Sequence, residues 1–181
     1  MKKWLAVVLA CIACLALAGC AKSGGGTYSN IRDYANRNGY NNWSYKCGDV
    51  ADVTTEMVYS YFSGKYLDFT GQGYIQKDIW QPAVDGEIMA VFTCPERGEA
   101  SVFVSLELVS LQETGSDGVA FYVTADCGNS YLYNVTLRGE ELTAEQSFTV
   151  DVEKGQEICF VLSALTSNSG DKTRVDIRVE I

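Results

Sequence analysis

The stretch Arg174-Val175-Asp176-Ile177-Arg178-Val179-Glu180-Ile181 alternates between charged and β-branched apolar residues. Successive side chains of a β-strand point to opposite faces, so this period of two predicts a strand with one buried and one solvated face. The same alternation recurs upstream, and it decides the fold class.

Earlier runs with this alternation lie between Gly86 and Ala164, separated by short segments rich in Gly, Asn, Asp and Ser. The predicted inward positions are Ile88, Ala90, Phe92 and Cys94; Val102, Val104, Leu106 and Leu108; Val119, Phe121, Val123 and Ala125; Tyr131, Tyr133, Val135 and Leu137; Phe148, Val150 and Val152; and Ile158, Phe160, Leu162 and Ala164. Short turns join antiparallel neighbours, and no amphipathic helix separates the runs. The sequence therefore predicts an all-β domain, an antiparallel β-sandwich or jelly roll.

The N-terminus is typical of an export signal. Lys2 and Lys3 precede an apolar run over residues 4–18, which is shorter than the ~20 residues that span a bilayer. The ending Leu17-Ala18-Gly19-Cys20 resembles the lipobox of bacterial lipoproteins. The resemblance implies cleavage before Cys20 and lipidation of its thiol, with acyl chains such as palmitate holding the protein on the extracytoplasmic face of the bacterial cell membrane.

Three segments are expected on this basis. Residues 1–19 form the signal peptide, and residues 20–38 form the lipidated N-terminus and a short flexible linker that contains a run of three glycines, Gly24 to Gly26. Residues 39–181 form a single jelly-roll domain, which is long enough to bury a core.

The charge balance restricts the function. The chain has 23 acidic and 14 basic residues, a formal net charge of −9 and no histidine. A negative surface disfavours nucleic acid and anionic lipid as partners. The lack of histidine removes the common general base, so we expect no enzyme. Glycoside hydrolysis needs only carboxylates, and its candidates would be Asp49, Asp52, Glu56, Asp78, Asp85 and Glu87.

Four cysteines lie outside the signal and lipidation site: Cys47, Cys94, Cys127 and Cys159. An even number in an exported domain allows two disulfides, and four buried thiols are the alternative. No pair has the close spacing of zinc ligands, so no metal is predicted at the thiols.

Two acidic turns are candidates for calcium, the one cofactor considered. Asp85-Gly86-Glu87 and Ser116-Asp117-Gly118 place carboxylates beside tight turns whose carbonyls would join them. Ordinary turn formation by Asp-Gly is the alternative.

Aromatic residues provide the strongest functional signal, with 3 Trp, 11 Tyr and 7 Phe in the chain. Flat rings stack against sugar rings when they are exposed, and neighbouring amides and carboxylates bind hydroxyl groups. Trp43, Tyr45 and Trp80 are the predicted ligand-binding residues. The alternative for these rings is a place in the core or in a cross-strand pair.

Several short motifs lie between Gly39 and the C-terminus: Gly39-Tyr40-Asn41-Asn42-Trp43-Ser44-Tyr45, Tyr74-Ile75, Trp80-Gln81-Pro82, Phe92-Thr93-Cys94-Pro95, Ser116-Asp117-Gly118-Val119 and Lys154-Gly155 before Ile158. Together they resemble a carbohydrate-binding jelly-roll module of secreted bacterial proteins. The resemblance implies a β-sandwich that binds sugar without catalysis. Gln156 stands where such modules usually have Asp, and the four cysteines are not part of the pattern.

We therefore expect a membrane-anchored extracytoplasmic lipoprotein whose non-catalytic β-sandwich binds glycan or cell-wall polysaccharide. The alternative is a protein-interaction or structural surface module that uses a sheet face or an edge strand and has no sugar ligand.

Overall fold

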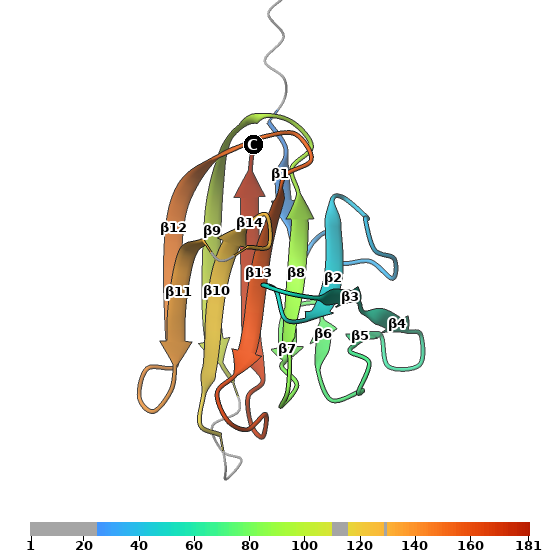
Figure 1. The fold of residues 1–181 in the computed structure, drawn as a ribbon. Helices are drawn as coiled ribbons and strands as arrows, with labels where there is room; N and C mark the ends of the chain where they lie inside the picture. Colours follow the sequence, from blue (N-terminus) through green and yellow to red (C-terminus); the bar gives the residue numbers. More distant parts are fainter. Residues whose placement is uncertain (1–24, 110–115, 129) are drawn as a thin grey trace, which may run out of the picture.

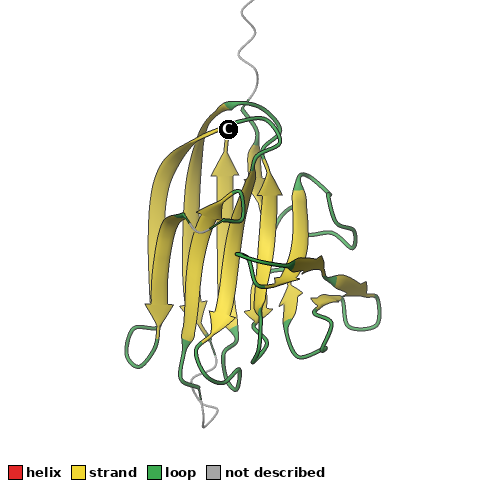
Figure 2. Cartoon of the chain, viewed as in Figure 1, coloured by secondary structure: helices red, strands yellow, loops and turns green. Residues whose placement is uncertain are grey.

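The computed structural model describes residues 25–109, 116–128 and 130–181. Within these ranges the chain forms strands and no helix, in two antiparallel sheets that pack face to face (Figure 1, Figure 2). The predicted all-β antiparallel sandwich is confirmed. The predicted signal peptide and Cys20 lie outside the described residues. In the described ranges no helix is long and apolar enough to span a membrane.

Sheet A has the order β12-β9-β14-β7-β6-β5-β4, and β1 pairs with β14 beside this path. Sheet B has the order β11-β10-β13-β8-β2-β3. The strands of sheet A are β1 (Thr27–Ser29), β4 (Val58–Ser60), β5 (Lys65–Leu67), β6 (Tyr74–Gln76), β7 (Ile79–Gln81), β9 (Gly98–Leu108), β12 (Thr143–Val152) and β14 (Thr173–Glu180). Those of sheet B are β2 (Trp43–Gly48), β3 (Thr54–Glu56), β8 (Glu87–Thr93), β10 (Val119–Ala125), β11 (Tyr131–Leu137) and β13 (Glu157–Ala164).

The core lies between the sheets and follows the predicted alternation. In β14 the apolar residues Val175, Ile177 and Val179 are fully buried, and the charged residues between them face outward. In sheet B they are matched by large rings such as Phe121 and Phe160, which are also fully buried. Burial of each such side chain contributes about 1.5–3 kcal/mol, so this interface dominates the stability of the sandwich.

Strand β11 departs from the predicted facing at one position. Its neighbour β10 pairs Val123 with Tyr133 and then Thr124 with Tyr131, so one residue of β11 has no partner in this pair. Such a bulge moves the next side chain to the other face. Tyr131, predicted inward, is therefore 60% exposed and packs edge-on against Tyr122 of the outer face.

The sequence predicts that each strand has one buried and one solvent-exposed face. At β8 and β13 of sheet B this is wrong, because the outer face is buried as well. Five residues form a second apolar cluster there, which we call the outer cluster: Val50, Met89, Val91, Cys159 and Val161. The segment after β2 folds over this face and supplies Val50. Strands buried on both faces have continuous apolar runs, and β8 shows this pattern in Ile88-Met89-Ala90-Val91-Phe92.

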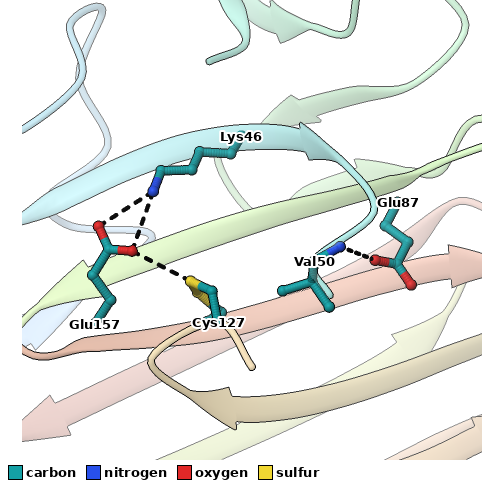
Figure 3. Close-up of a disulfide and its surroundings, with 6 residues drawn as sticks. Lys46, Val50, Glu87, Cys127 and Glu157 are labelled. Carbon is teal, nitrogen blue, oxygen red and sulfur yellow. Dashed lines mark hydrogen bonds and ion pairs between the residues drawn. A yellow bond between two sulfur atoms is a disulfide. The ribbon is translucent and has the colours of Figure 1, made fainter. Parts of the chain in front are cut away.

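Glu87 holds the covering segment in place (Figure 3). Its carboxylate accepts the backbone N–H of Val50 at 2.9 Å and the hydroxyl of Tyr122. Burial and this acceptor raise the pKa of the Tyr122 hydroxyl. Nearby, the ammonium of Lys46 lies 3.2 Å from the Glu157 carboxylate (Figure 3).

One disulfide closes over the outer cluster. Cys127, in the turn after β10, is joined to Cys159 of β13, with Cα atoms 5.3 Å apart (Figure 3). Cys47 and Cys94 are buried free thiols. Cys47 lies opposite Ile88, six residues along β8 from Cys94, which is a separation of roughly 20 Å and beyond the reach of a disulfide. Both expected arrangements, two disulfides and four buried thiols, are therefore wrong for the described chain.

The folded domain begins before residue 39, so the predicted linker over residues 20–38 is too long. β14 pairs with β7 at Thr173 and Arg174 and with β1 only from Arg178 onward. Asn30 fills the gap between these partners. Its side-chain amide donates to the Val175 carbonyl at 2.8 Å, and its Oδ1 accepts the Ile177 N–H at 2.7 Å, with all three groups buried.

Replacement of Asn30 tests this bridge. In Asn30→Ala a buried carbonyl and a buried N–H lose their partners, and each costs about 1–3 kcal/mol. We expect the free energy of unfolding in urea to fall by that amount per group. The exposed Asn134 of β11 provides a matched control, since Asn134→Ala should stay within about 0.5 kcal/mol of the parent. Equal unfolding midpoints for the two variants would contradict the assignment.

The disulfide gives a second prediction. It spans 32 residues, and a bridge of this length stabilises a domain by about 2–4 kcal/mol. A thiol reductant should lower the free energy of unfolding by this amount in the parent and in Cys47→Ser, but not in Cys159→Ala. The assignment fails if the reductant acts equally on Cys159→Ala.

Candidate functional site

The three predicted ligand-binding aromatics lie in the core. Trp43 and Tyr45 are 1% exposed and Trp80 is 0% exposed. Trp43 packs against Phe92 and Phe160 at ring-centroid distances of 5.1 and 5.8 Å. A sugar cannot reach these rings, so the predicted stacking site is wrong.

Tyrosines hold the short strands of sheet A on the sandwich. Tyr66 of β5 lies 4.3 Å from Tyr45 and 5.2 Å from Tyr59, measured between ring centroids. Tyr34 contacts Tyr66 edge-on and donates its hydroxyl to the Ile75 carbonyl. Burial is the main cause that raises the pKa of Tyr66 to about 12. The aromatic richness of this region is therefore explained by packing.

Phe69 is the exposed ring that borders a hollow in the described structure. It follows β5 and is 77% exposed. Two adjoining cavities of about 220 and 280 Å³ share Gly48, Phe69, Asp85, Gly86 and Glu87 as lining residues. We call them together the acidic hollow. Its other lining residues are Cys47, Asp49, Asp68, Thr70, Gln72, Ala83 and Ser163.

Three turns build the acidic hollow: the turn after β2, the β5–β6 turn and the β7–β8 turn. In the first, Gly48 has a φ of +122°, and a Cβ there would lie 2.3 Å from the Val53 carbonyl oxygen, so only glycine fits. In the second, the Asp68 N–H donates to the Gly73 carbonyl and the Thr70 hydroxyl donates to Asp68 Oδ2 at 2.8 Å. These bonds fix Asp68 and leave Phe69 at the rim.

Only some of the six carboxylates that the sequence predicts as candidates lie at the hollow. The hollow brings together Asp49, Asp85 and Glu87 from the predicted carboxylate set. Asp52, Glu56 and Asp78 do not line it, and Asp78 lies 3.5 Å from Arg174 instead. Asp68 and Phe69 were missed, because no local motif distinguishes them from ordinary turn residues.

The carboxylates of the hollow differ in their availability. Glu87 binds the covering segment, and Asp49 accepts the N–H of Ala51 at 2.8 Å. Asp68 is 7% exposed, and its buried Oδ1 has no hydrogen-bond partner. Asp85 is exposed and has no hydrogen bond or ion pair with the rest of the described chain. Asp85 is therefore the exposed acceptor without a partner, and Asp68 holds a buried oxygen without one.

The electrostatic character of the hollow is negative throughout. Its ionisable lining residues are four carboxylic acids and the Cys47 thiol, and no lysine or arginine lines it. Burial, with a smaller contribution from Asp68, raises the pKa of that thiol. Cys47 is thus a protonated, unreactive part of the floor.

The described acidic and thiol side chains of the hollow do not gather three ligand atoms within 4.8 Å of one another. A metal ion would need several His, Cys, Asp or Glu side chains with their ligand atoms close together. In the described structure one such group of three lies within 4.8 Å, and it consists of Cys127, Glu157 and Cys159. Its two sulfurs form the disulfide. Calcium at Asp85-Gly86-Glu87 remains a prediction.

The second acidic turn, Ser116-Asp117-Gly118, meets a buried carboxylate. Asp171 is 0% exposed and accepts the Ser116 hydroxyl at 2.9 Å, and its Oδ2 has no partner within the described residues. Asp117 binds the Ser167 N–H at 3.3 Å. Burial is the main cause that raises the pKa of Asp171 to about 6. Calcium at this turn also remains a prediction.

A larger groove of about 620 Å³ crosses the outer face of sheet A. It is lined by Ser101, Phe103, Ser147, Thr149, Arg178 and Glu180, with Val102 and Phe148 below. The Arg178 guanidinium lies 5.0 Å from the Phe103 ring centroid and also pairs with Asp176 at 2.7 Å. The ring of this groove therefore already has a cation of the chain beside it. In the hollow, Phe69 has no such cation and Asp85 has no ion pair within the described residues.

No protein-family model and no curated protein match this sequence. A family 35 carbohydrate-binding module from Clostridium thermocellum is similar at 13% identity and a TM-score of 0.38, over 86% of this chain and 98% of that one. The family 35 module of Cellvibrio japonicus Abf62 has the same identity and TM-score, over 85% of this chain and 92% of that one. The C-terminal family 6 module of a Zobellia galactanivorans laminarinase is similar at 14% identity and a TM-score of 0.33, over 77% of this chain and 100% of that one. None of these three TM-scores reaches 0.5, so the comparisons carry no argument about a ligand.

The raised pKa of Asp171 predicts a pH dependence of stability. The unfolded chain releases this proton near pH 3.8 and the folded chain near pH 6. The contribution of Asp171 to stability is therefore largest below pH 3.8 and is lost as the pH rises to about 6. Asp171→Asn should remove this loss, so the variant should gain stability relative to the parent between pH 4 and 6, measured by urea unfolding. A constant difference across this range would contradict the pKa assignment.

Proposed function

We propose that this chain is a non-catalytic glycan-binding domain whose ligand site is the acidic hollow. One observation carries the proposal: an exposed ring, Phe69, borders a concave site that is also lined by the carboxylates of Asp68 and Asp85. A ring face stacks on the apolar face of a sugar, and carboxylates accept its hydroxyl protons.

The lining of the hollow supports a binding role rather than hydrolysis. A glycosidase needs an acid and a nucleophile or base on either side of the scissile bond. Glu87 and Asp49 already accept backbone N–H groups, so they serve the loops that shape the site. The chain has no histidine to supply another base.

We further propose that lipidation at Cys20 anchors the domain to the extracytoplasmic face of the membrane. β1, where the described chain enters the sandwich, lies beside the C-terminal end of β14 at the top of Figure 1. Gly48 and Glu87 lie at the opposite ends of β2 and β8 from the contact between Trp43 and Phe92. An anchor at the entry end would leave the hollow facing away from the membrane.

Replacement of Phe69 tests the proposal. A library of neutral and charged oligosaccharides is screened against the full-length protein, and the affinity of each binder is measured by calorimetry. Phe69→Ala should weaken binding about tenfold, equivalent to about 1.4 kcal/mol.

Two phenylalanines provide matched controls. Phe62 is fully exposed but does not line the hollow, so Phe62→Ala should bind as the parent does. Phe103→Ala should also retain binding, because that ring lies in the groove of sheet A. Loss of binding in Phe103→Ala alone would move the site to the groove. Absence of binding to any glycan would favour a protein-interaction module.

A further inference from the structure

We infer that the glycan bound in the acidic hollow carries free amino groups, as in a polymer of de-N-acetylated amino sugars. The inference rests on the proposed function and names the class of sugar. It starts from the sign of the charge at the site. Four carboxylic acids and no cationic side chain line the hollow, so an ammonium group complements it and a neutral hydroxyl does so only in part.

Asp68, one of these four acids, also lacks a donor. This side chain is more than nine-tenths buried and lines the hollow, and its Oδ1 has no partner. A buried carboxylate without a full set of donors is costly, and a cation held nearby offsets its charge. The Thr70 hydroxyl satisfies only the other oxygen, Oδ2.

Phe69 adds a second feature suited to a cation. An ammonium near the face of an aromatic ring is attracted by its quadrupole, and this attraction acts at exposed rings such as Phe69 as well. The neighbouring strands already contain such a contact, since the Lys65 ammonium lies 3.7 Å from the ring centroid of Tyr74. In the hollow the ring is present and no cation of the described chain accompanies it.

The spacing of the acids suits an organic cation whose charge is carried on a larger body. No three of the hollow's acidic or thiol side chains bring their ligand atoms within 4.8 Å of one another. A hard metal ion needs its oxygen ligands closely gathered. Separate carboxylates around cavities of about 220 and 280 Å³ suit a sugar-sized ligand whose ammonium contacts one or two of them.

The test compares three oligosaccharides of equal length and β-1,4 linkage: a glucosamine oligomer, its N-acetylated form and a cello-oligosaccharide. Calorimetry on the full-length protein should give at least about tenfold tighter binding for the glucosamine oligomer, about 1.4 kcal/mol. Added salt should reduce this preference. Raising the pH until the amine is neutral should abolish this preference, because the ligand then carries no positive charge.

Substitutions locate the preference. Asp68→Asn and Asp85→Asn should each reduce the preference at least about fivefold, while folding is checked by thermal unfolding. Asp151→Asn makes the same change of net charge on the exposed face of β12, outside the hollow, and should keep the preference. Loss of preference in Asp151→Asn to the same extent would reduce the effect to overall charge and overturn the inference.

The outcomes separate the two proposals. Equal affinity for all three oligosaccharides with loss in Phe69→Ala would keep the glycan site and overturn the amino-sugar inference. Absence of binding by all three and by the wider library would overturn the glycan proposal itself. A lysine tripeptide that binds as tightly as the glucosamine oligomer would show recognition of the amine without the sugar, and it too would overturn the inference.

Discussion

The side chain of Asn30 completes the central strand of sheet A. β14 lies between β9 on one side and two short strands, β1 and β7, on the other, and those two do not meet. In the gap, the side-chain amide of Asn30 takes the place of a backbone peptide group. It donates to the Val175 carbonyl and accepts the Ile177 N–H. The buried centre of the sheet therefore depends on a residue that precedes every long strand in the sequence.

The same N-terminal segment also fixes its own turn. The Asp33 carboxylate accepts the Ser29 N–H at 2.8 Å, and the Asp33 N–H donates to the Ser29 carbonyl at 2.9 Å. Tyr34 then reaches the tyrosines that hold β5 and β6. A chain of contacts thus runs from β1 to the turn that positions Asp68 and Phe69. The hollow is formed by loops, but those loops are supported by packed side chains on both sides.

Sheet B supports the hollow from the other side. Glu87 starts β8 and lies at the border between the hollow and the outer cluster. Its carboxylate ties down Val50, which covers the outer cluster, and so it couples the shape of the hollow to the packing on the outer face. This double role explains why a carboxylate at this position is not itself free to bind a ligand.

The long strands could be predicted from the sequence because period-two alternation reports directly on which side is buried. The alternation in β9, β10, β13 and β14 identifies their core residues correctly. It does not show a second covering layer or a bulge, since both depend on contacts between distant segments. The prediction was wrong for Tyr131 and for the outer faces of β8 and β13 for these reasons.

The candidate site was harder to predict than the fold. Trp43, Tyr45 and Cys47 alternate like any inward-facing strand, and this pattern already favours burial of the two rings. Composition alone made them look like a binding surface. Asp49, Asp85 and Glu87 were recognisable as carboxylates near turns, but only the fold brings them beside Asp68 and Phe69.

The position of β1 also has a mechanical consequence. Tension applied at residue 25 and resisted at the hollow would run along the axis of β1. Tyr28 of β1 contacts Phe92 near one end of β8, and Glu87 at the other end of β8 lines the hollow. The bonds between β1 and β14, and those of Asn30, would then be loaded in shear and share the force. Strands pulled in this direction must break several bonds at once, whereas strands pulled sideways open one bond at a time. Although β1 has only three residues, it can therefore resist a larger pulling force than its length suggests.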